Sequence, residues 1–366
     1  MANSEASGAQ KSYCIADSDN SSDYRKAALN NTKGLMSFNN KKVLVTGAGG
    51  FIGSHLVERL LTLGAHVRAF VHYNSRGSWG HLDQSSLVQN ADRLEVLAGD
   101  IRDPFLVRSI VQDCDLVFHL AALIAIPFSY RAPQSYVETN ITGTLNMLEA
   151  CRAGGVQKLI HTSTSETYGT AQYVPIDETH PLQGQSPYSA TKIAADKLVE
   201  SFACSFALPV VTLRPFNTYG PRQSARAVIP TIISQIVAGK KTIALGSLSP
   251  VRDFTYVRDT VEGFIAIARA PIRAGTVINV GSGTGITIGE VTQLIQQQLG
   301  TAVDIVEEQV RIRPENSEVM QLVCANAKAA ELLGWRPQYS LAAGIKETIA
   351  YITSNLHQYR PNANSV

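Results

Sequence analysis

The chain has 366 residues, of which 45% are hydrophobic, and this is enough to bury a large core in one big α/β domain joined to a smaller one. A formal net charge of +2 provides no basic surface, so we do not expect nucleic acid as a partner. The five cysteines are scattered without any Cys-x-x-Cys spacing, which argues against a zinc site and against a disulfide framework.

The first segment, residues 1–40, is rich in Ser, Asn, Ala and Lys. It lacks the apolar central run of a signal peptide, and we expect it to be a disordered tail. No window approaches the roughly 18 uninterrupted apolar residues of a membrane span, so we expect no membrane association. A reducing cytoplasm is the expected compartment, and a metal is not expected.

The first predicted strand, Lys42–Thr46, leads directly into the glycine-rich turn of VLVTGAGGFIGSH. Three glycines permit a tight turn, close backbone approach to a pyrophosphate, and tight packing of a helix on a strand. The amphipathic stretch Ile52–Leu63 supplies that helix, whose N-terminus favours phosphate. This pattern indicates a dinucleotide site. The residues expected to bind cofactor here are Gly47, Gly50, Phe51, Ile52 and Gly53.

The second predicted strand, His66–Val71, ends where an acidic residue would bind the ribose hydroxyls of NAD. This chain has His72 there, and the nearby Ser75 and Arg76 are suited to a 2′-phosphate. We therefore expect NAD(P)+ as the cofactor and favour NADP over NAD. The alternative for Arg76 is a solvated surface charge.

The third and fourth predicted strands are Leu94–Ala98 and Leu116–His119. Asp100 and Ile101 follow the third strand and are expected to hold the adenine edge, while Asp103 is a candidate helix cap. After the fourth strand, small side chains let the cofactor pass close to the backbone. The residues expected to do so are Leu120, Ala121 and Ala122. His119 and His161 lie at strand ends and are expected to be core histidines rather than ligands.

The fifth predicted strand, Lys158–His161, leads into HTSTSETYG. Thr164 can hydrogen-bond a substrate oxygen, and Ser165 and Glu166 follow it directly. A plain alcohol dehydrogenase needs no further carboxylate, whereas proton abstraction beside a newly formed ketone does. The alternative for Glu166 is that it caps the following turn or helix.

Tyr188 and Lys192 in SPYSATKIAADK lie four residues apart, on one face of a predicted helix over Pro187–Phe206. A phenol is a poor base at neutral pH, but a neighbouring ammonium and the nicotinamide charge favour its anion. The pair can then deprotonate a hydroxyl while hydride leaves the same carbon. The sequence therefore predicts catalytic roles for Tyr188 and Lys192. Both are also expected to contact the cofactor.

Alternation of these strands, and of Val210–Arg214, with helical stretches predicts a doubly wound parallel sheet of the Rossmann type. A smaller, discontinuous C-terminal substrate domain is expected beside it. The expected division is 41–215 for the dinucleotide domain, rejoined by about 253–281, and 216–252 with 282–354 for the substrate domain, before a frayed tail at 355–366. Later elements are predicted at Ala227–Ala238, Thr276–Val280, Ile288–Leu299 and Val303–Val306.

Several motifs together resemble the extended short-chain dehydrogenase/reductase family, specifically its nucleotide-sugar 4,6-dehydratases, over nearly the whole chain after residue 40. They are TGAGGFIGS, HLAA, TSTSETYG, SPYSATK and RPFNTYGPR. The Thr-Ser-Glu order resembles GDP-mannose 4,6-dehydratase, whereas the dTDP-glucose enzymes have Thr-Asp-Glu. The stretches VHYNSRGSWGHLD, HPLQGQSPYS and RPFNTYGPRQSARAVIPTI resemble UDP-N-acetylglucosamine 4,6-dehydratases of legionaminic acid pathways more closely.

The resemblance implies a tightly held, recycled cofactor and a UDP-sugar substrate. Tyr188 takes the O4 proton as C4 hydride moves to NAD(P)+, Glu166 removes the C5 proton as water departs from C6, and hydride returns to C6. The product is a 4-keto-6-deoxy sugar. Because Ser165 replaces the acid of the Asp-bearing relatives, two routes stay open: Glu166 serves as both base and acid, or Ser165 relays a proton through water.

The same comparison implies residues for the substrate. Asn217 and Arg252 resemble residues that grip the diphosphate, and Arg313 is expected to join them, although an arginine at either position can also be a surface ion pair. The residues that resemble the wall of the nucleotide-base pocket are Val228, Ile229 and Pro230. Asn140 is expected to fix the loop under the site, and Asp259 to cap a helix.

Two helices, Ala132–Ala153 and Pro187–Phe206, resemble those that pair in family homodimers, so a homodimer is expected. Three rival functions remain. A UDP-glucuronate decarboxylase needs a cation for the sugar carboxylate, which PLQGQSP before Tyr188 does not offer. A 4-epimerase needs no acid at Glu166. An inactive scaffold that only binds nucleotide would not need the reactive side chains, all of which are present: Thr164, Glu166, Tyr188 and Lys192.

Overall fold

A seven-stranded sheet in the order β11-β6-β5-β4-β1-β2-β3 forms the centre of the computed structural model, which describes residues 36–83, 92–308, 311 and 314–359. All neighbouring strands in it are parallel. The strands are β1 (Lys42–Thr46), β2 (His66–His72), β3 (Leu94–Gly99), β4 (Leu116–His119), β5 (Lys158–Thr162), β6 (Val210–Pro215) and β11 (Val277–Val280). The predicted doubly wound parallel sheet is confirmed, and each strand ends within one residue of its predicted bounds.

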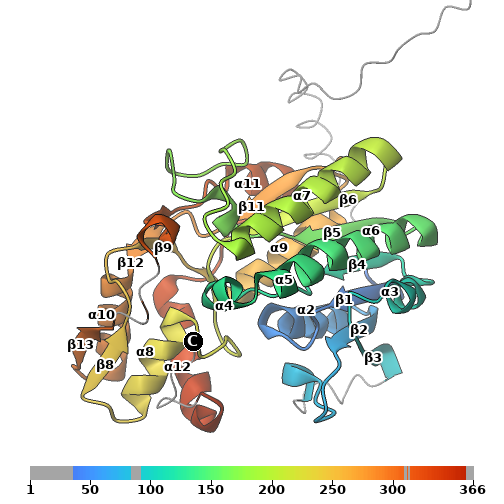
Figure 1. Cartoon of the computed structure of the whole chain (residues 1–366). Helices are drawn as coiled ribbons and strands as arrows, with labels where there is room; N and C mark the ends of the chain where they lie inside the picture. The colour runs from blue at the N-terminus through green and yellow to red at the C-terminus, as the bar shows by residue number, and fades with distance from the viewer. Residues whose placement is uncertain (1–35, 84–91, 309–310, 312–313, 360–366) are drawn as a thin grey trace, which may run out of the picture.

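Helices cover both faces of this sheet (Figure 1). One face carries α2 (Phe51–Thr62) and α9 (Val257–Arg269), and the other carries α3 (Pro104–Val111), α6 (Gly143–Gly154) and α7 (Pro187–Phe206). Strand alternation explains the two layers, because successive side chains point to opposite faces. In β1, Val43 and Val45 join the core under α2 and α9, whereas Leu44 joins the core under the other three helices.

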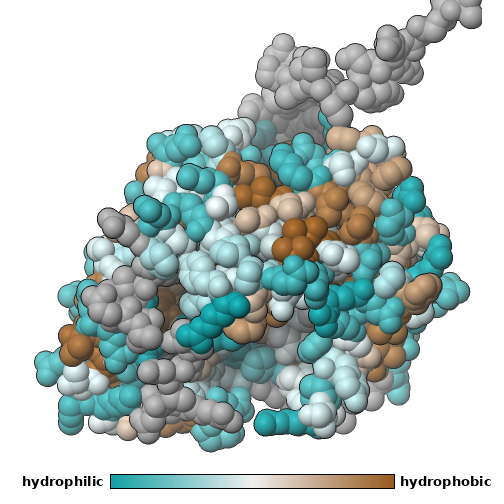
Figure 2. Space-filling view, viewed as in Figure 1, coloured by the Kyte–Doolittle hydropathy of each residue, from teal (hydrophilic) through white to brown (hydrophobic). Residues whose placement is uncertain are grey.

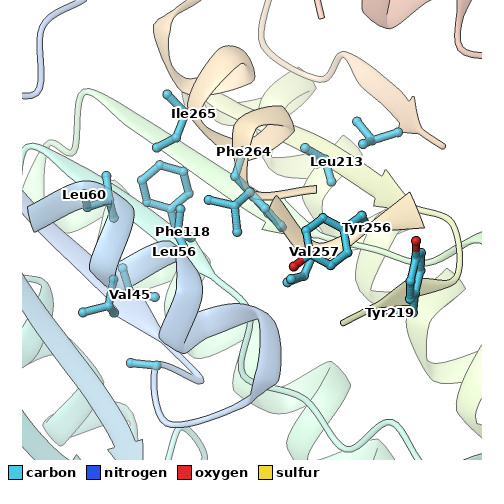
Figure 3. Close-up of a cluster of buried hydrophobic side chains, with 14 of the residues drawn as sticks. Val45, Leu56, Leu60, Phe118, Leu213, Tyr219, Tyr256, Val257, Phe264 and Ile265 are labelled. Carbon is cyan, nitrogen blue, oxygen red and sulfur yellow. The ribbon is translucent and has the colours of Figure 1, made fainter. Parts of the chain in front are cut away.

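The core under α2 and α9 is built from aliphatic side chains around aromatic rings. Figure 3 shows Leu56 and Leu60 of α2 and Phe264 of α9 gathered around Phe118 of β4. The rings of Phe118 and Phe264 meet edge to face, with their centroids 6.3 Å apart. The core continues toward Tyr219 and the second part of the molecule.

An irregular helical segment precedes α6. It consists of α4 (Ile126–Arg131), α5 (Pro133–Tyr136) and a π-helical turn, Val137–Thr142, that runs directly into α6. π-Helical turns are rare and occur frequently at functional sites. This one packs beside α7, the helix that carries the predicted tyrosine and lysine.

The α7 helix has a well-defined start. Ser186 and Ser189 form a reciprocal capping box, and Pro187 occupies the first turn, where its missing N–H costs nothing. The helix begins and ends at the residues predicted from the sequence.

The smaller part of the molecule lies beside the main sheet, at the lower left of Figure 1. Its helices are α8 (Val228–Val237), α10 (Ile288–Leu299) and α12 (Leu341–Ser354), while α11 (Ala327–Leu333) packs against β11 and α9. Its short strands are β7 (Thr218–Tyr219), β8 (Thr242–Leu245), β9 (Val251–Asp253), β10 (Thr255–Tyr256), β12 (Gly285–Thr287), β13 (Asp304–Glu307) and β14 (Gln321–Leu322). They form three small sheets, β10-β7, β12-β9-β14 and β13-β8.

The described structure extends further into both expected tails than the sequence predicts. Phe38 is buried against Phe118, with ring centroids 6.5 Å apart, and the guanidinium of Arg269 lies over its ring. Near the other end, Leu356–Gln358 form a short helical turn, and Tyr359 is buried. The remainder of the two predicted tails, 1–35 and 360–366, lies outside the described residues. Aromatic burial therefore corrects the tail boundaries.

Among the residues that the structure describes, no helix combines the length and the apolar character needed to cross a bilayer.

Candidate active site

A cavity of about 1600 Å³ lies outside the carboxyl ends of the parallel strands, where ligands bind in folds of this kind. Most of the predicted site residues line it. They are Gly47, Gly50, Phe51, Ile52, Gly53, His72, Ser75, Arg76, Asp100, Ile101, Leu120, Ala121, Ala122, Thr164, Ser165, Glu166, Tyr188, Asn217, Val228, Ile229 and Arg252. Lys192 and Pro230 are buried behind its wall, and Arg313 lies outside the described residues.

The glycine turn packs tightly against the end of β4. Gly47 has φ +68°, and a Cβ there would come within 2.9 Å of the Ala121 nitrogen. A Cβ on Gly53 would overlap the carbonyl oxygen of Gly47. Both positions therefore require glycine, the first for its conformation and both for backbone contact.

The start of α2 fits a pyrophosphate. Gly50 precedes the helix and provides no side-chain cap, and the first turn contains no acidic residue. The first N–H groups of a helix have no intrahelical partners, so they and the helix dipole suit an anion. Together with the close-packed glycines, this arrangement fits the dinucleotide expected from the sequence.

A hydroxyl supports the floor of the site between β1 and β4. Thr46 Oγ1 accepts hydrogen bonds from the Leu120 nitrogen at 3.2 Å and the Ala121 nitrogen at 3.1 Å. It also lies 2.8 Å from His119 Nδ1, and His119 Nε2 lies 3.2 Å from Thr144 Oγ1. His119 is therefore a core histidine that orders the strand ends, as predicted.

Asp100, which the sequence predicts to hold the adenine edge, forms an ion pair within the chain. The carboxylate of Asp100 accepts from Arg102, with Nη2 at 2.6 Å from Oδ2, and this bond lowers the pKa of Asp100. Arg102 also lies 3.1 Å from Glu138. Asp103 caps α3 as predicted, accepting from the amides of residues 105 and 106.

The loop after β2 folds over the glycine turn. Asn74 Oδ1 accepts from the backbone of Arg76 at 3.1 Å and of Ser78 at 3.3 Å, which shapes a turn that presents Arg76 to the cavity. Trp79 also lines the cavity, and a Cβ on Gly49 would come within 2.5 Å of its carbonyl oxygen. The sequence analysis missed Trp79, because nothing in strand or helix periodicity marks a loop residue.

The predicted reacting groups meet at the centre of the cavity. Thr164 starts a short helical turn, Ser165–Tyr168, and its hydroxyl accepts from the Glu166 nitrogen at 3.3 Å. The Thr164 side chain also hydrogen-bonds Tyr188. The turn is thus capped by Thr164, and the alternative of Glu166 as the cap is wrong.

Burial raises the pKa of the Tyr188 phenol, while the bond from Thr164 lowers it and the charge of Glu166 raises it. The sequence analysis expected the anion to be favoured. In this protein burial outweighs the partners within the chain, because a buried phenolate loses its hydration. Glu166 and Tyr188 line the same cavity, and the charge of the carboxylate acts on the phenol.

Lys192 lies one helical turn beyond Tyr188 and is buried. Its Nζ donates to the carbonyl oxygen of Thr162 at 2.7 Å. Burial lowers its pKa to about 8, opposed by the charge of Asp196. The amine is therefore fixed at the end of β5, behind the cavity wall.

Two side chains support this centre. Asn140 of the π-helical turn holds both backbone groups of Leu123, at 2.9 and 3.0 Å, and donates to Thr191 Oγ1 at 3.1 Å. It fixes the loop under the site, as predicted. The ring of Tyr136 meets that of Tyr188 edge to face at 6.3 Å, a contact that the sequence gave no signal for.

The substrate side of the cavity follows β6. Asn217 lines it, and its Nδ2 is buried without a hydrogen-bond partner among the described residues. Arg252 of β9 lines it too, and its Nη2 lies 3.1 Å from Glu318 Oε1, so the predicted diphosphate residue is also an ion-pair partner. Val228 and Ile229 open α8 along this wall.

Three further arginines line the cavity. Arg311, two residues before the predicted Arg313, lies 2.8 Å from Glu308. Arg131 ends α4, and Arg226 precedes α8 and acts electrostatically on Tyr136. The sequence analysis did not select them, because only the tertiary structure shows which arginines line the cavity.

Asp259 is not a helix cap. It lies inside the first turn of α9, and its carboxylate accepts from the nitrogens of Gln338 at 2.9 Å and Tyr339 at 3.0 Å. The prediction of a structural role holds, but the role is to bind a distant loop. Across the described part of the chain, no three His, Cys, Asp or Glu side chains converge as a metal site would require.

Comparison with known proteins agrees with this geometry. The profile of the GDP-mannose 4,6-dehydratase family matches residues 44–348. A UDP-glucose 4-epimerase from Mycolicibacterium smegmatis is 33% identical over 85% of this chain and 98% of its own length. A dTDP-glucose 4,6-dehydratase from Streptomyces antibioticus is 32% identical over 87% of this chain and 94% of its own.

Solved structures show the same similarity. A dTDP-glucose 4,6-dehydratase from Streptomyces venezuelae with NAD bound has a TM-score of 0.79 and 29% identity, covering 88% of this chain and 100% of that one. A UDP-glucuronic acid 4-epimerase from Bacillus cereus with NAD bound has a TM-score of 0.78 and 30% identity over 86% and 99% of the two chains. The chain therefore belongs to the GDP-mannose 4,6-dehydratase family, within the nucleotide-sugar dehydratases and epimerases of the extended short-chain dehydrogenase/reductase group.

Proposed function

We propose that this enzyme is a nucleotide-sugar 4,6-dehydratase that converts UDP-N-acetylglucosamine to a UDP-4-keto-6-deoxy sugar. The observation that carries the proposal is that the carboxylate of Glu166 lines the same cavity as Thr164 and the phenol of Tyr188. Oxidation at C4 needs only the phenol and its partners. A second ionisable group beside it suits removal of the C5 proton, which the C4 ketone makes acidic.

In the proposed reaction, Tyr188 accepts the proton of the C4 hydroxyl while Thr164, hydrogen-bonded to the phenol, orients the same oxygen. Bound cofactor supplies a hydride acceptor for C4 and a hydride donor for C6. Glu166 removes the C5 proton and delivers it to the departing C6 hydroxyl, and solvent provides the proton that C5 regains. The net change is loss of one water.

Lys192 does not touch substrate in this scheme. Its ammonium, held on the Thr162 carbonyl, favours the Tyr188 anion from behind. Ser165 is buried beside Glu166 and, without an acidic group, leaves Glu166 as the acid of this step. The other route, relay through Ser165 and water, would leave turnover dependent on the Ser165 hydroxyl.

On the substrate side, we propose that Asn217 and Arg252 bind the diphosphate, and that Arg313 joins them. The planar guanidinium of Arg252 can bind phosphate oxygens when it releases Glu318, its ion-pair partner. Val228 and Ile229 form the wall of the base pocket, with Pro230 fixing the first turn of α8 behind them. We also propose the division into two domains that the sequence predicts, with the cavity between the dinucleotide part and the substrate part.

We further propose NADP as the preferred cofactor. His72 stands where an acidic residue would repel a 2′-phosphate, and Arg76 lines the cavity close by. Asp100, the nearest carboxylate after β3, is paired with Arg102 and therefore contributes little net negative charge.

We also propose that the protein is a homodimer that pairs through the surface of α6 and α7. Figure 2 shows hydrophobic side chains gathered over these helices. Leu145 of α6 and Phe206 at the end of α7 are exposed, as is Val137 of the π-helical turn before α6. Exposed apolar surface of this kind supports the proposed pairing surface.

A nucleotide-sugar 4-epimerase is the second candidate, because epimerases stand among the similar proteins. It would use the Tyr188 and Lys192 pair and return hydride to C4, so Glu166 would have no part in proton transfer. A UDP-glucuronate decarboxylase is a weaker candidate, since the loop before Tyr188 carries no cation.

Incubation of the purified protein with UDP-N-acetylglucosamine should give a product lighter by one water, without added cofactor. Deuterium placed at C4 should be recovered at C6, because the hydride returns to that carbon. Mass spectrometry on a panel of UDP-, GDP- and dTDP-sugars checks both points. An isomer of unchanged mass would establish the epimerase instead.

Glu166→Gln should lower turnover by about 100-fold or more, since it removes the C5 base, yet leave C4 oxidation intact. Reduced cofactor should therefore accumulate and be visible by absorbance. Tyr188→Phe, the matched variant, should lose C4 oxidation itself. Full dehydration by the Glu166 variant would remove this carboxylate from the mechanism.

Cofactor released from the purified protein should be NADP, identified by mass. Arg76→Ala should weaken NADP binding about tenfold and leave NAD binding unchanged, because only NADP offers the 2′-phosphate. Arg108→Ala on α3 removes an exposed charge that does not line the cavity and serves as the control. Equal weakening of both cofactors by Arg76→Ala would contradict the assignment.

Light scattering should give twice the mass of the chain. Leu145→Glu should halve it, because a buried unpaired carboxylate would face its counterpart across the interface. Val306→Glu, on the exposed side of β13, introduces the same charge elsewhere and should leave the mass unchanged. A monomeric wild type would refute the dimer.

A further inference from the structure

A buried group of charged side chains lies behind the Tyr188 and Lys192 pair. Its centre is Asp196, which follows Lys192 by four residues and Tyr188 by eight, so the three share one face of α7. Asp196 does not line the cavity, and its side chain is only 5% exposed. A buried carboxylate is costly unless it is paired, so its presence here requires an explanation.

The carboxylate of Asp196 joins three elements. Its Oδ2 accepts from Ser163 Oγ at 2.7 Å and from Arg214 at 2.7 Å, which connects α7 to the ends of β5 and β6. Its Oδ1 lies 3.2 Å from His161 Nε2. These partners hold the pKa of Asp196 well below its usual range despite burial, so the group is an anion.

Hydrogen bonds extend this buried group away from the cavity, to the neutral side chains of Tyr168 and Asn279. Arg214 Nη1 donates to the Tyr168 hydroxyl at 3.0 Å, and this hydroxyl donates to Asn279 Oδ1 at 2.7 Å. On the other side, the His161 ring faces that of His119 at 5.9 Å. Burial lowers the pKa of both imidazoles, and the nearby Lys192 lowers it further.

Two cations, Lys192 and Arg214, are therefore buried around one buried anion. The Nζ of Lys192 donates to the carbonyl oxygen of Thr162, a neutral group that does not compensate its charge. Asp196 follows Lys192 by one helical turn and binds Ser163, the neighbour of Thr162, so its negative charge lies close to the ammonium and stabilises it. We propose that Asp196 is a positioning residue that keeps Lys192 charged and in place behind Tyr188, and so sets the pH range of C4 oxidation.

The proposal rests on the proposed roles of Tyr188 and Lys192 in C4 oxidation, but not on the dehydration that follows. The ionisable side chains facing this region come from every element around it. They are His119 of β4, His161 of β5, Arg214 of β6, Tyr188, Lys192 and Asp196 of α7, Glu166 and Tyr168 of the turn after β5, and Tyr136 of α5.

The sign of the effect follows from these neighbours. Asp196 raises the pKa of Lys192, which burial lowers to about 8, and it also raises the pKa of Tyr188. Removing its charge therefore lowers both values. The ammonium form of Lys192, present below its pKa, would be lost at a lower pH, and the Tyr188 phenolate would form at a lower pH.

The test is the pH profile of the first half-reaction, measured as the rate of cofactor reduction in a single turnover of the holoenzyme. The substrate is UDP-N-acetylglucosamine or, if the panel above selects another nucleotide sugar, that sugar. Asp196→Asn should move the alkaline limb of the profile to lower pH by about one unit or more, a tenfold loss of relative rate on that limb. Dehydratases, epimerases and decarboxylases of this family all begin with C4 oxidation, so failure of the proposed dehydration leaves this readout valid.

Two variants separate charge from packing. Asp196→Glu keeps the charge and should keep the wild-type limb. Tyr168→Phe breaks the hydrogen bonds from Arg214 and to Asn279 without changing any charge, so it should leave the limb in place even if it lowers the melting temperature. An equal shift in Tyr168→Phe would show that loosened packing, and not charge, moves the profile, and would overturn the proposal.

Asp196→Asn leaves Arg214 buried without its anion and can fail to fold. The double variant Asp196→Asn with Arg214→Met removes both members of the pair, so it leaves no unpaired guanidinium. It should show the same shift of the alkaline limb. A folded variant of either kind with an unmoved profile refutes the role of Asp196.

A second measurement needs no sugar. Nuclear magnetic resonance of protein labelled with carbon-13 at the lysine Cε, recorded across pH, gives the ionisation of Lys192 directly. In cofactor-free protein, the titration of Lys192 should move to lower pH in Asp196→Asn or in the double variant, and stay in place in Tyr168→Phe. Identical titrations in all of them would exclude the proposed electrostatic control.

Discussion

Close backbone contact between the turn after β1 and the end of β4 is the constraint on which the site depends. Gly47 and Gly53 leave no room for a Cβ, because the turn packs on Ala121 and the helix packs on the turn. Thr46 holds the same strand end through its hydroxyl. This contact brings the start of α2 to the point where the strand order reverses, which creates the crevice for a dinucleotide.

The reacting groups depend on the next strands of the same sheet. Because β5 pairs in parallel with β4 and β6, its carboxyl end delivers Thr164 and Glu166 to the crevice that the glycine turn opens. Helix α7 then crosses behind them, and its face presents Tyr188 to the cavity and Lys192 to the strand end. The placement of these side chains in the cavity therefore depends on strand order as much as on residue type.

Polar side chains beneath the cavity form hydrogen bonds that join the elements around it. Asn140 of the π-helical turn spans Leu123 and Thr191, so the loop and α7 keep a common position. Asp196 joins α7 to β5 and β6. Low exposure strengthens such interactions and makes any unpaired member costly, so the packing of α7 on the sheet depends on these pairs.

The sequence by itself determined the strands of the main sheet, the bounds of α7, the glycine turn and the choice of side chains that we propose to react, because these depend on local periodicity and on short motifs. Only the tertiary structure decided the rest: the burial of Phe38, the loop-binding role of Asp259, the arginines at positions 131, 226 and 311, and the contact of Tyr136 with Tyr188. Each of these depends on which distant segment packs beside the residue. No pattern within one stretch of chain carries that information, because contact across the fold is set by the packing of whole elements.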